Sequence, residues 1–245
     1  MPSPPLVAYT VTVTSTGAAF LVALDPASGE AEFGFSIADA IGYTSRSWLA
    51  VVRTSDVVTA VELDGGYARS RYPIFDPTWS GAYEWLRFGF DGRPPATPAP
   101  GASVAPAAED AAGPSVIAVV RAISSGAYRV DDRGTEACED GQNGKHLRLE
   151  PTGDPDRYPA TDLVLRSGDD RICTMRFDLR PTQFWALAGT VELHFAQIGG
   201  YEVVGDGRLQ FSARIRGIGK RRVTMRMLYS DFSFPSRAPE GAFER

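Results

Sequence analysis

The sequence predicts a mostly β protein, built as a single curved antiparallel sheet or half-barrel (a β-meander) with one or two short helices. Apolar and polar residues alternate in many short stretches, as they do in strands buried on one face. The 245 residues include 25 Gly and 18 Pro, which interrupt the chain as strand-connecting turns do. Between these turns, β-branched and aromatic residues are frequent, which also favours strands.

The N-terminal segment predicts the first strand. Valines and Tyr9 alternate with threonines from Val7 to Thr14. Residues 1–24 carry no charged side chain, which raises a membrane-spanning helix as an alternative. The threonines, a serine and a glycine in this stretch make a poor spanning helix. We therefore expect two strands joined as a hairpin that turns near residues 15–17.

The rest of the first half continues as predicted strands. Phe33 and Phe35 share one face of the stretch AEFGFSI, and Asp64-Gly65 is a typical hairpin turn between alternating runs. Aromatic residues, including Trp85, gather at 76–90, and we expect a short amphipathic helix there, with a strand as the alternative. Core packing is the favoured interpretation of these aromatics, and a lid over a cavity is the other.

Residues 93–115 are mostly Pro, Ala, Gly and Ser, with two acids and no aromatic residue. Such a segment cannot bury enough apolar surface to offset its ordering entropy, so we expect it to be disordered. We predict one domain over 1–245, built from 6–92 and 116–235, with 93–115 as a disordered Pro/Ala-rich insertion. Two β domains joined by a linker are the alternative.

The second half carries the clearest strand patterns. The apolar run 115–123 and the stretches that follow it predict successive strands, and Gly205-Asp206-Gly207 predicts a turn. Beyond this turn, apolar side chains of 208–216 and 220–229 share one face of a long hairpin, and arginines share the other. An exposed polar face is the favoured interpretation of the arginines from Arg208 to Arg226. A docking surface for an acidic partner or phosphate headgroups is the other.

Composition limits the partners. The net charge is −5 and the sequence pI is about 5.2, which argue against nucleic acid and anionic membrane surfaces as default partners. No basic region followed by an apolar core opens the chain, and we expect no integral membrane segment.

The two cysteines, Cys138 and Cys173, predict a structural disulfide. Two unrelated buried thiols are the alternative for an intracellular chain. A disulfide implies an oxidising compartment, so we expect a periplasmic or secreted protein, although no signal peptide is visible.

The sequence gives little evidence for a catalytic or metal-binding site. His146 and His194 have no metal-ligand spacing with another His or Cys, so we expect no metal and no cofactor. Acidic pairs occur at 131–132, 154 and 156, and 169–170, each beside an arginine. Turn acids with a nearby arginine are the common case, and paired carboxylates of a hydrolase are the alternative.

The stretch KHLRLEPTGDPDRYPATDLVLRSGDDRICTMRF and the long hairpin from Gly207 to Phe234 resemble lipoprotein-carrier-like half-barrels of the LolA/LolB type. The layout is closest to uncharacterised exported bacterial proteins, and the resemblance covers about Val116 to Phe234. It implies an open, strongly curved sheet with helices on its concave side, and carriage of lipoprotein acyl chains. Leu165 stands where an aromatic residue is usual, and no functional residue carries over.

We therefore expect a non-enzymatic extracytoplasmic protein that binds a hydrophobic or lipid-like ligand, such as an acyl chain, on the concave face of the sheet. A protein-interaction or envelope scaffold module without a small-molecule ligand is the first alternative. A hydrolase that uses turn carboxylates is the second. The candidate ligand-binding residues are Phe33, Phe35, Trp85, Leu209, Phe211, Ile215, Met225 and Met227.

Overall fold

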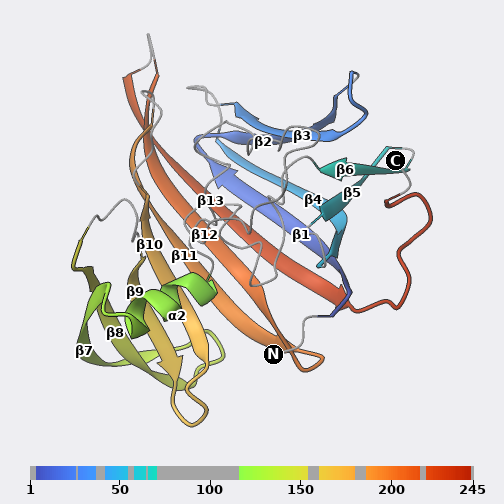
Figure 1. Ribbon diagram of the computed structural model, residues 1–245. Helices are drawn as coiled ribbons and strands as arrows, with labels where there is room; N and C mark the ends of the chain where they lie inside the picture. The colour runs from blue at the N-terminus through green and yellow to red at the C-terminus, as the bar shows by residue number, and fades with distance from the viewer. Residues whose placement is uncertain are drawn as a thin grey trace, which may run out of the picture.

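The computed structural model describes residues 4–25, 27–36, 42–54, 58–64, 66–70, 116–153, 160–179, 186–215 and 219–243. In these residues, thirteen strands form one sheet and α2 (Val116–Ser124) is the helix (Figure 1). The strands are β1 (Leu6–Thr16), β2 (Ala19–Leu24), β3 (Ala31–Ser36), β4 (Tyr43–Arg53), β5 (Val58–Leu63), β6 (Gly66–Ser70), β7 (Tyr128–Ala137), β8 (Asn143–Pro151), β9 (Ala160–Arg166), β10 (Ile172–Leu179), β11 (Ala186–Ile198), β12 (Tyr201–Ile215) and β13 (Gly219–Ser233).

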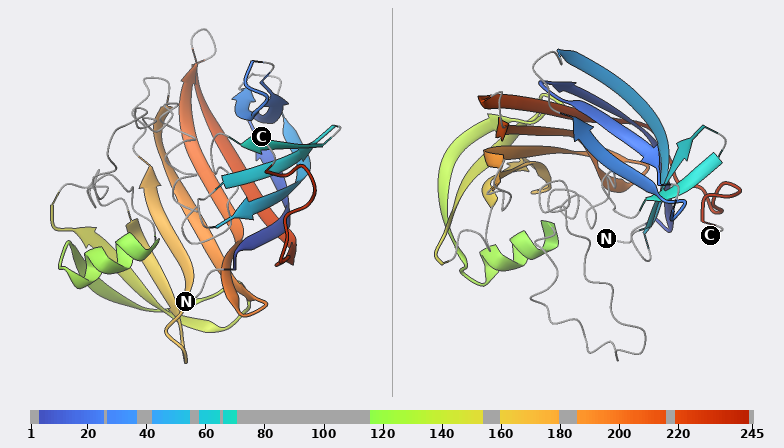
Figure 2. Two further views of the ribbon diagram at one scale, coloured as in Figure 1. Left: turned by 45° about the vertical axis from the view of Figure 1, so that its right-hand side comes forward. Right: turned by 90° about the horizontal axis from the view of Figure 1, so that it is seen from above.

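The predicted fold class is confirmed. From β7 to β13 each strand pairs antiparallel with the next, which is a β-meander. β1 then lies between β13 and β4, so both halves of the chain contribute to one sheet. The spatial order is β2-β3-β6-β5-β4-β1-β13-β12-β11-β10-β9-β8-β7, and the sheet curves strongly (Figure 2). The pairing of β3 with β6, at Ala31 and Ser70, is parallel.

The predicted hairpin at residues 15–17 is wrong, although both of its strands form. β1 pairs with β4 and β13, and β2 pairs with β3 instead. Gly17 makes the corner with a φ of +80°, and a Cβ on it would lie 2.7 Å from the backbone oxygen of Arg222. The glycine marks a close approach to β13, which a sequence pattern alone does not distinguish from a hairpin turn.

The predicted turn at Gly205-Asp206-Gly207 is also wrong. These residues lie inside β12, which runs unbroken for 15 residues, and the turn before β12 is Gly199-Gly200. By contrast, the Asp64-Gly65 hairpin is confirmed by the pairing of Leu63 with Gly66.

The run 115–123 forms α2 rather than a strand. A short continuous apolar run fits a buried strand and a buried helix equally well, so its period could not decide between them. α2 lies on the concave side of the sheet, beside β7–β9 (Figure 2). Its Val119 belongs to the main core, which places that core on the concave face.

The expectations for 76–90 and 93–115 fall outside the described residues, and the predicted domain division stays a prediction. Among the described helical residues, none forms a segment of the length and apolarity needed to cross a membrane.

Candidate functional site

The concave face carries one continuous set of buried apolar side chains. In β1 the predicted alternation places Val7, Tyr9, Val11 and Val13 on this face. β11 and β13 add members at every second position, because strand side chains alternate between the two faces. β9, β10 and β12 add further members, with irregular spacing along β9 and β10 where their pairing has register shifts. The result is an apolar surface that extends across neighbouring strands of a curved sheet.

Four of the candidate ligand-binding residues meet at the centre of this surface. Leu209 lies directly opposite Met225, and Phe211 and Met227 occupy the next positions on the same face of the β12–β13 ladder. Their exposed fractions are 7% for Leu209, 2% for Phe211, 5% for Met225 and 3% for Met227. All four are therefore buried members of the core.

For the other four candidates the structure describes no side chain, so their place relative to this surface stays untested. Phe33 and Phe35 are on β3, and β6, β5, β4 and β1 lie between β3 and β13. Ile215 is the last residue of β12. The side chains of these three residues lie outside the described part of the chain, as does the whole of Trp85.

Sequence reasoning missed several residues of the concave face. Met175 on β10 is fully buried in the same core as Met225 and Met227. Tyr9 and Tyr229 are buried with their ring centroids 5.8 Å apart, across the β1–β13 pair that joins the two halves. Alternation alone could have placed each on the concave face, but the β1–β13 pairing was needed to bring the two tyrosines together.

The opposite, outer face carries a row of charges across six strands. Arg148, Asp162, Arg176, Glu192, Arg208 and Arg226 occupy directly opposed positions on β8 to β13. Arg148 Nη1 donates to Asp162 Oδ2 at 2.8 Å, and Arg176 Nε donates to Glu192 Oε2 at 2.5 Å. Positively and negatively charged side chains alternate along this row as far as Arg208. The next residue, Arg226, carries the same charge as Arg208.

Asp206 neutralises the like charges of Arg208 and Arg226. Its side chain is 1% exposed, and it accepts from Arg208 Nε at 3.0 Å and from Arg226 Nε at 2.8 Å. The hydrogen bond to Asp206 raises the pKa of Arg226. A buried carboxylate costs much free energy unless it is paired, and the two guanidinium groups supply that pairing.

Both histidines belong to the same outer-face network. His146 lies between two carboxylates, with Nδ1 3.2 Å from Glu136 Oε2 and Nε2 2.9 Å from Asp162 Oδ1. His194 Nε2 lies 2.7 Å from Glu192 Oε1, and Nδ1 lies 3.2 Å from the hydroxyl of Thr174.

The carboxylates of the network are held in their ionised form. The hydrogen bond from His194, together with that from Arg176, lowers the pKa of Glu192 to about 2 against the effect of burial. Arg176 likewise lowers the pKa of Glu136 by hydrogen bonding. Burial opposes ionisation of Asp162, but hydrogen bonds from His146 and Thr161 outweigh it, so its pKa is lowered too.

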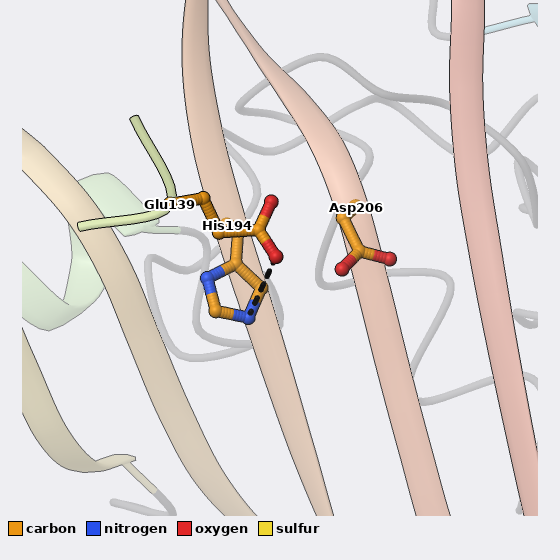
Figure 3. Close-up of side chains that lie close together, drawn as sticks. All are labelled: Glu139, His194 and Asp206. Atoms are coloured by element: carbon orange, nitrogen blue, oxygen red, sulfur yellow. Dashed lines mark ion pairs between the residues drawn. The ribbon is translucent and has the colours of Figure 1, made fainter. Parts of the chain in front are cut away.

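Three donors in the network are close enough together to suggest a metal centre. Ligand atoms of Glu139, His194 and Asp206 lie within 4.8 Å of one another (Figure 3). However, Arg208 already binds two of them, with Nη2 2.6 Å from Glu139 Oε1 and 2.9 Å from Asp206 Oδ2. The guanidinium therefore takes the place that a cation would need, and these donors do not fit a resident metal.

The predicted disulfide is present between Cys138 and Cys173. It ties the connection between β7 and β8 to β10, and with Val164 it forms a small second core. Glu139 follows Cys138 directly, so the disulfide holds this carboxylate over His194 and Arg208. Sequence adjacency to the cysteine was the one signal that could have placed Glu139.

In each described acidic pair considered for a hydrolase, one aspartate lies near an arginine. Asp131 lies 3.8 Å from Arg133, and Asp169 lies 3.4 Å from Arg171. Asp131 and Asp132 are in β7, whereas Asp169 and Asp170 are in the turn after β9, so the two pairs do not share one turn. Asp154 and Asp156 lie outside the described residues.

No family model matches the chain, and no curated protein matches it. A comparison with solved structures finds two matches that extend over most of this chain. One is described as an outer membrane lipoprotein-sorting protein domain from Vibrio parahaemolyticus, with a TM-score of 0.33 and 12% identity over 98% of this chain and 89% of that one. The other is a LolA superfamily protein from Nitrosomonas europaea, with a TM-score of 0.29 and 11% identity over 99% and 91% of the two chains.

Proposed function

We propose that this protein is a non-enzymatic extracytoplasmic binding protein that holds a hydrophobic, lipid-like ligand on the concave face of its sheet. The observation that carries the proposal is the convergence of Leu209, Phe211, Met225 and Met227 at the centre of a curved apolar surface. Concave apolar surfaces with adaptable side chains are natural sites for acyl chains.

Methionine strengthens this proposal. The chain has four methionines, and Met175, Met225 and Met227 are all in the concave core. The unbranched, polarisable thioether fills irregular space and repacks at low cost, which suits a ligand of variable length. The disulfide supports an oxidising compartment, and hence a periplasmic or secreted location.

A scaffold module without a small-molecule ligand is the second candidate function. One observation favours it: the four central side chains are 2–7% exposed, as in a core that stays filled. The two candidates differ in whether this face opens to admit a ligand.

The test is titration of the purified protein with a dansyl-labelled fatty acid, followed by displacement with unlabelled acyl lipids. Saturable binding is expected, and Met225→Glu should abolish it, because a charge on the concave face opposes an acyl chain. Thr224→Glu is the matched control, since Thr224 is the exposed neighbour on the same strand. Its binding should equal that of the unmodified chain.

A variant that keeps core volume guards against misfolding of Met225→Glu. The double variant Met225→Leu/Met227→Leu should keep the circular dichroism spectrum of the unmodified chain. It should bind a narrower range of acyl-chain lengths, because leucine adapts its shape less than methionine does. Absence of any saturable binding to the unmodified chain would reject the carrier and favour the scaffold.

A further inference from the structure

Positive charge is concentrated in one hairpin. Between Gly207 and Ser230 the sequence has seven Lys or Arg residues and no Asp or Glu. The rest of the chain holds 18 basic residues against 30 acidic ones. The β12–β13 hairpin is therefore a basic element on an otherwise acidic protein.

In the inner part of this hairpin, nearest the outer-face network, the arginines are neutralised. Arg208 and Arg226 are bound by Asp206 in the outer-face network. Further out on the same face, Arg214 lies directly opposite Lys220, and Ser212 lies opposite Arg222. Within the described part of the chain, no carboxylate forms an ion pair with Arg214, Lys220 or Arg222. Arg222 donates instead to Gln210 Oε1 at 2.9 Å.

The outer part also extends beyond the described ladders of the neighbouring strands. On the β11 side the last partner is Ala213, opposite Ala186, and on the β1 side it is Thr224, opposite Thr16. Beyond these residues the described strands β12 and β13 pair with each other alone. Gly17 lies against the backbone of Arg222, so the described part that extends past β1 begins there. At ~3.3 Å per residue, the three steps from Arg222 to Gly219 span roughly 10 Å.

The arrangement has an electrostatic consequence. Like charges directly opposite each other destabilise a sheet, so the Arg214–Lys220 pair costs the fold free energy. The outer part of the hairpin can approach an anionic surface while the acidic body stays farther away than the Debye length of ~8 Å at physiological salt. Salt then screens the repulsion between the acidic body and the anionic surface, while the basic hairpin is still attracted to that surface.

We propose that the outer part of the β12–β13 hairpin, where Arg214, Lys220 and Arg222 are the contact residues, docks on an anionic lipid surface. The segment from Ser212 to Arg222 has no aromatic side chain on which a nucleic-acid base could stack. In sequence, its cations are instead interleaved with isoleucines at 215 and 218, a combination typical of segments that lie in a membrane interface. This docking goes beyond the proposed ligand binding and does not depend on it.

The test is co-sedimentation of the full chain with vesicles of phosphatidylcholine, with and without about a third of phosphatidylglycerol. Binding is expected to the anionic vesicles alone and to be lost in high salt. The triple variant Arg214→Gln/Lys220→Gln/Arg222→Gln should bind about 100-fold more weakly, at about fivefold per charge near an anionic surface.

A matched variant separates position from net charge. Arg129→Gln/Arg133→Gln/Lys145→Gln removes three exposed cations from β7 and β8, at one edge of the sheet and away from the β12–β13 hairpin, and changes net charge by the same amount. Its vesicle binding should equal that of the unmodified chain. Equal weakening by both triple variants, equal binding to neutral vesicles, or binding to a single-stranded oligonucleotide but not to vesicles would each overturn the proposal. Acyl-probe binding is measured separately, so loss of one activity does not imply loss of the other.

Discussion

Leu209 on β12 lies directly opposite Met225 on β13, and both side chains are buried on the concave face. Their contact joins the two longest strands of the sheet at its centre. Replacing either residue by Ala should lower the free energy of unfolding by about 2–5 kcal/mol, and the double variant should cost less than the two together, because neighbours share one cavity. Denaturant unfolding measures all three.

Gln210→Ala is the control for that cycle, because Gln210 lies between Leu209 and Phe211 on the outer face. Its effect should stay within about 0.5 kcal/mol. Strictly additive losses for Leu209→Ala and Met225→Ala would contradict the contact.

The disulfide predicts a second result. Cys138 and Cys173 are 35 residues apart, so in the chain-entropy model their bond adds about 3–4 kcal/mol to stability. The double variant Cys138→Ser/Cys173→Ser should lose an amount of that order. Thiol titration of the unfolded chain should find no free thiol before reduction and two after it. Two free thiols before reduction would remove the argument for an oxidising compartment.

The outer-face network predicts a dependence on pH. Glu136, Asp162 and Glu192 have lowered pKa values in the folded protein, so each carboxylate contributes stability above its unfolded pKa. That contribution falls as the pH drops through the folded values, which for Glu192 is about 2. Urea unfolding between neutral and acid pH should therefore show a steady loss of stability.

Glu192→Gln separates this residue from the rest of the network. It should be less stable than the unmodified chain at neutral pH, and the difference should shrink on acidification, because protonation of Glu192 removes the same charge. Glu150→Gln is the control, because the ion pair of Glu150 with Arg129 lies on the surface, and its effect on stability at neutral pH should stay within about 1 kcal/mol. A difference between Glu192→Gln and the unmodified chain that is constant with pH would contradict the ionised Glu192.

Two glycines in the central strands predict opposite outcomes. A Cβ on Gly189 would lie 2.5 Å from the backbone oxygen of Gln210 and 2.8 Å from Phe211 Cβ, so Gly189→Ala should destabilise the protein. A Cβ on Gly207 would make ordinary contacts at 3.5 Å with Leu193 and Met227. Gly207→Ala should therefore be neutral or stabilising by up to about 1 kcal/mol. Thermal unfolding of the two variants distinguishes them, and the reverse order would be inconsistent with the packing of β12 against β11.

Much of the fold could be predicted because strand alternation is local. The patterns around Val11, Phe211 and Met225 each assign a buried face without knowledge of the neighbouring strand. Chain corners are different, because Gly17 and Gly205-Asp206-Gly207 have turn-like composition but serve a close backbone approach and a buried ion pair. Only the tertiary structure distinguishes these uses of glycine.

The outer-face network could not be predicted from the sequence, for a related reason. Arg176, Glu192 and Arg208 are each 16 residues apart, and they become neighbours through the registers of two hairpins. A shift of one residue in either register would move the whole row to the other face. The candidate site was predicted in part for the same reason, since the alternation found Leu209, Phe211, Met225 and Met227 but gave no measure of how deeply they are buried.

The most direct test of the central claim is native mass spectrometry of gently purified protein, followed by organic extraction of the same sample. We predict a bound acyl or lipid mass that is absent from Met225→Glu and retained by Thr224→Glu. Circular dichroism should show that both variants are folded. If repeated preparations show only the mass of the protein without bound ligand, and added acyl lipids do not bind, the result would contradict a carrier role for the concave face.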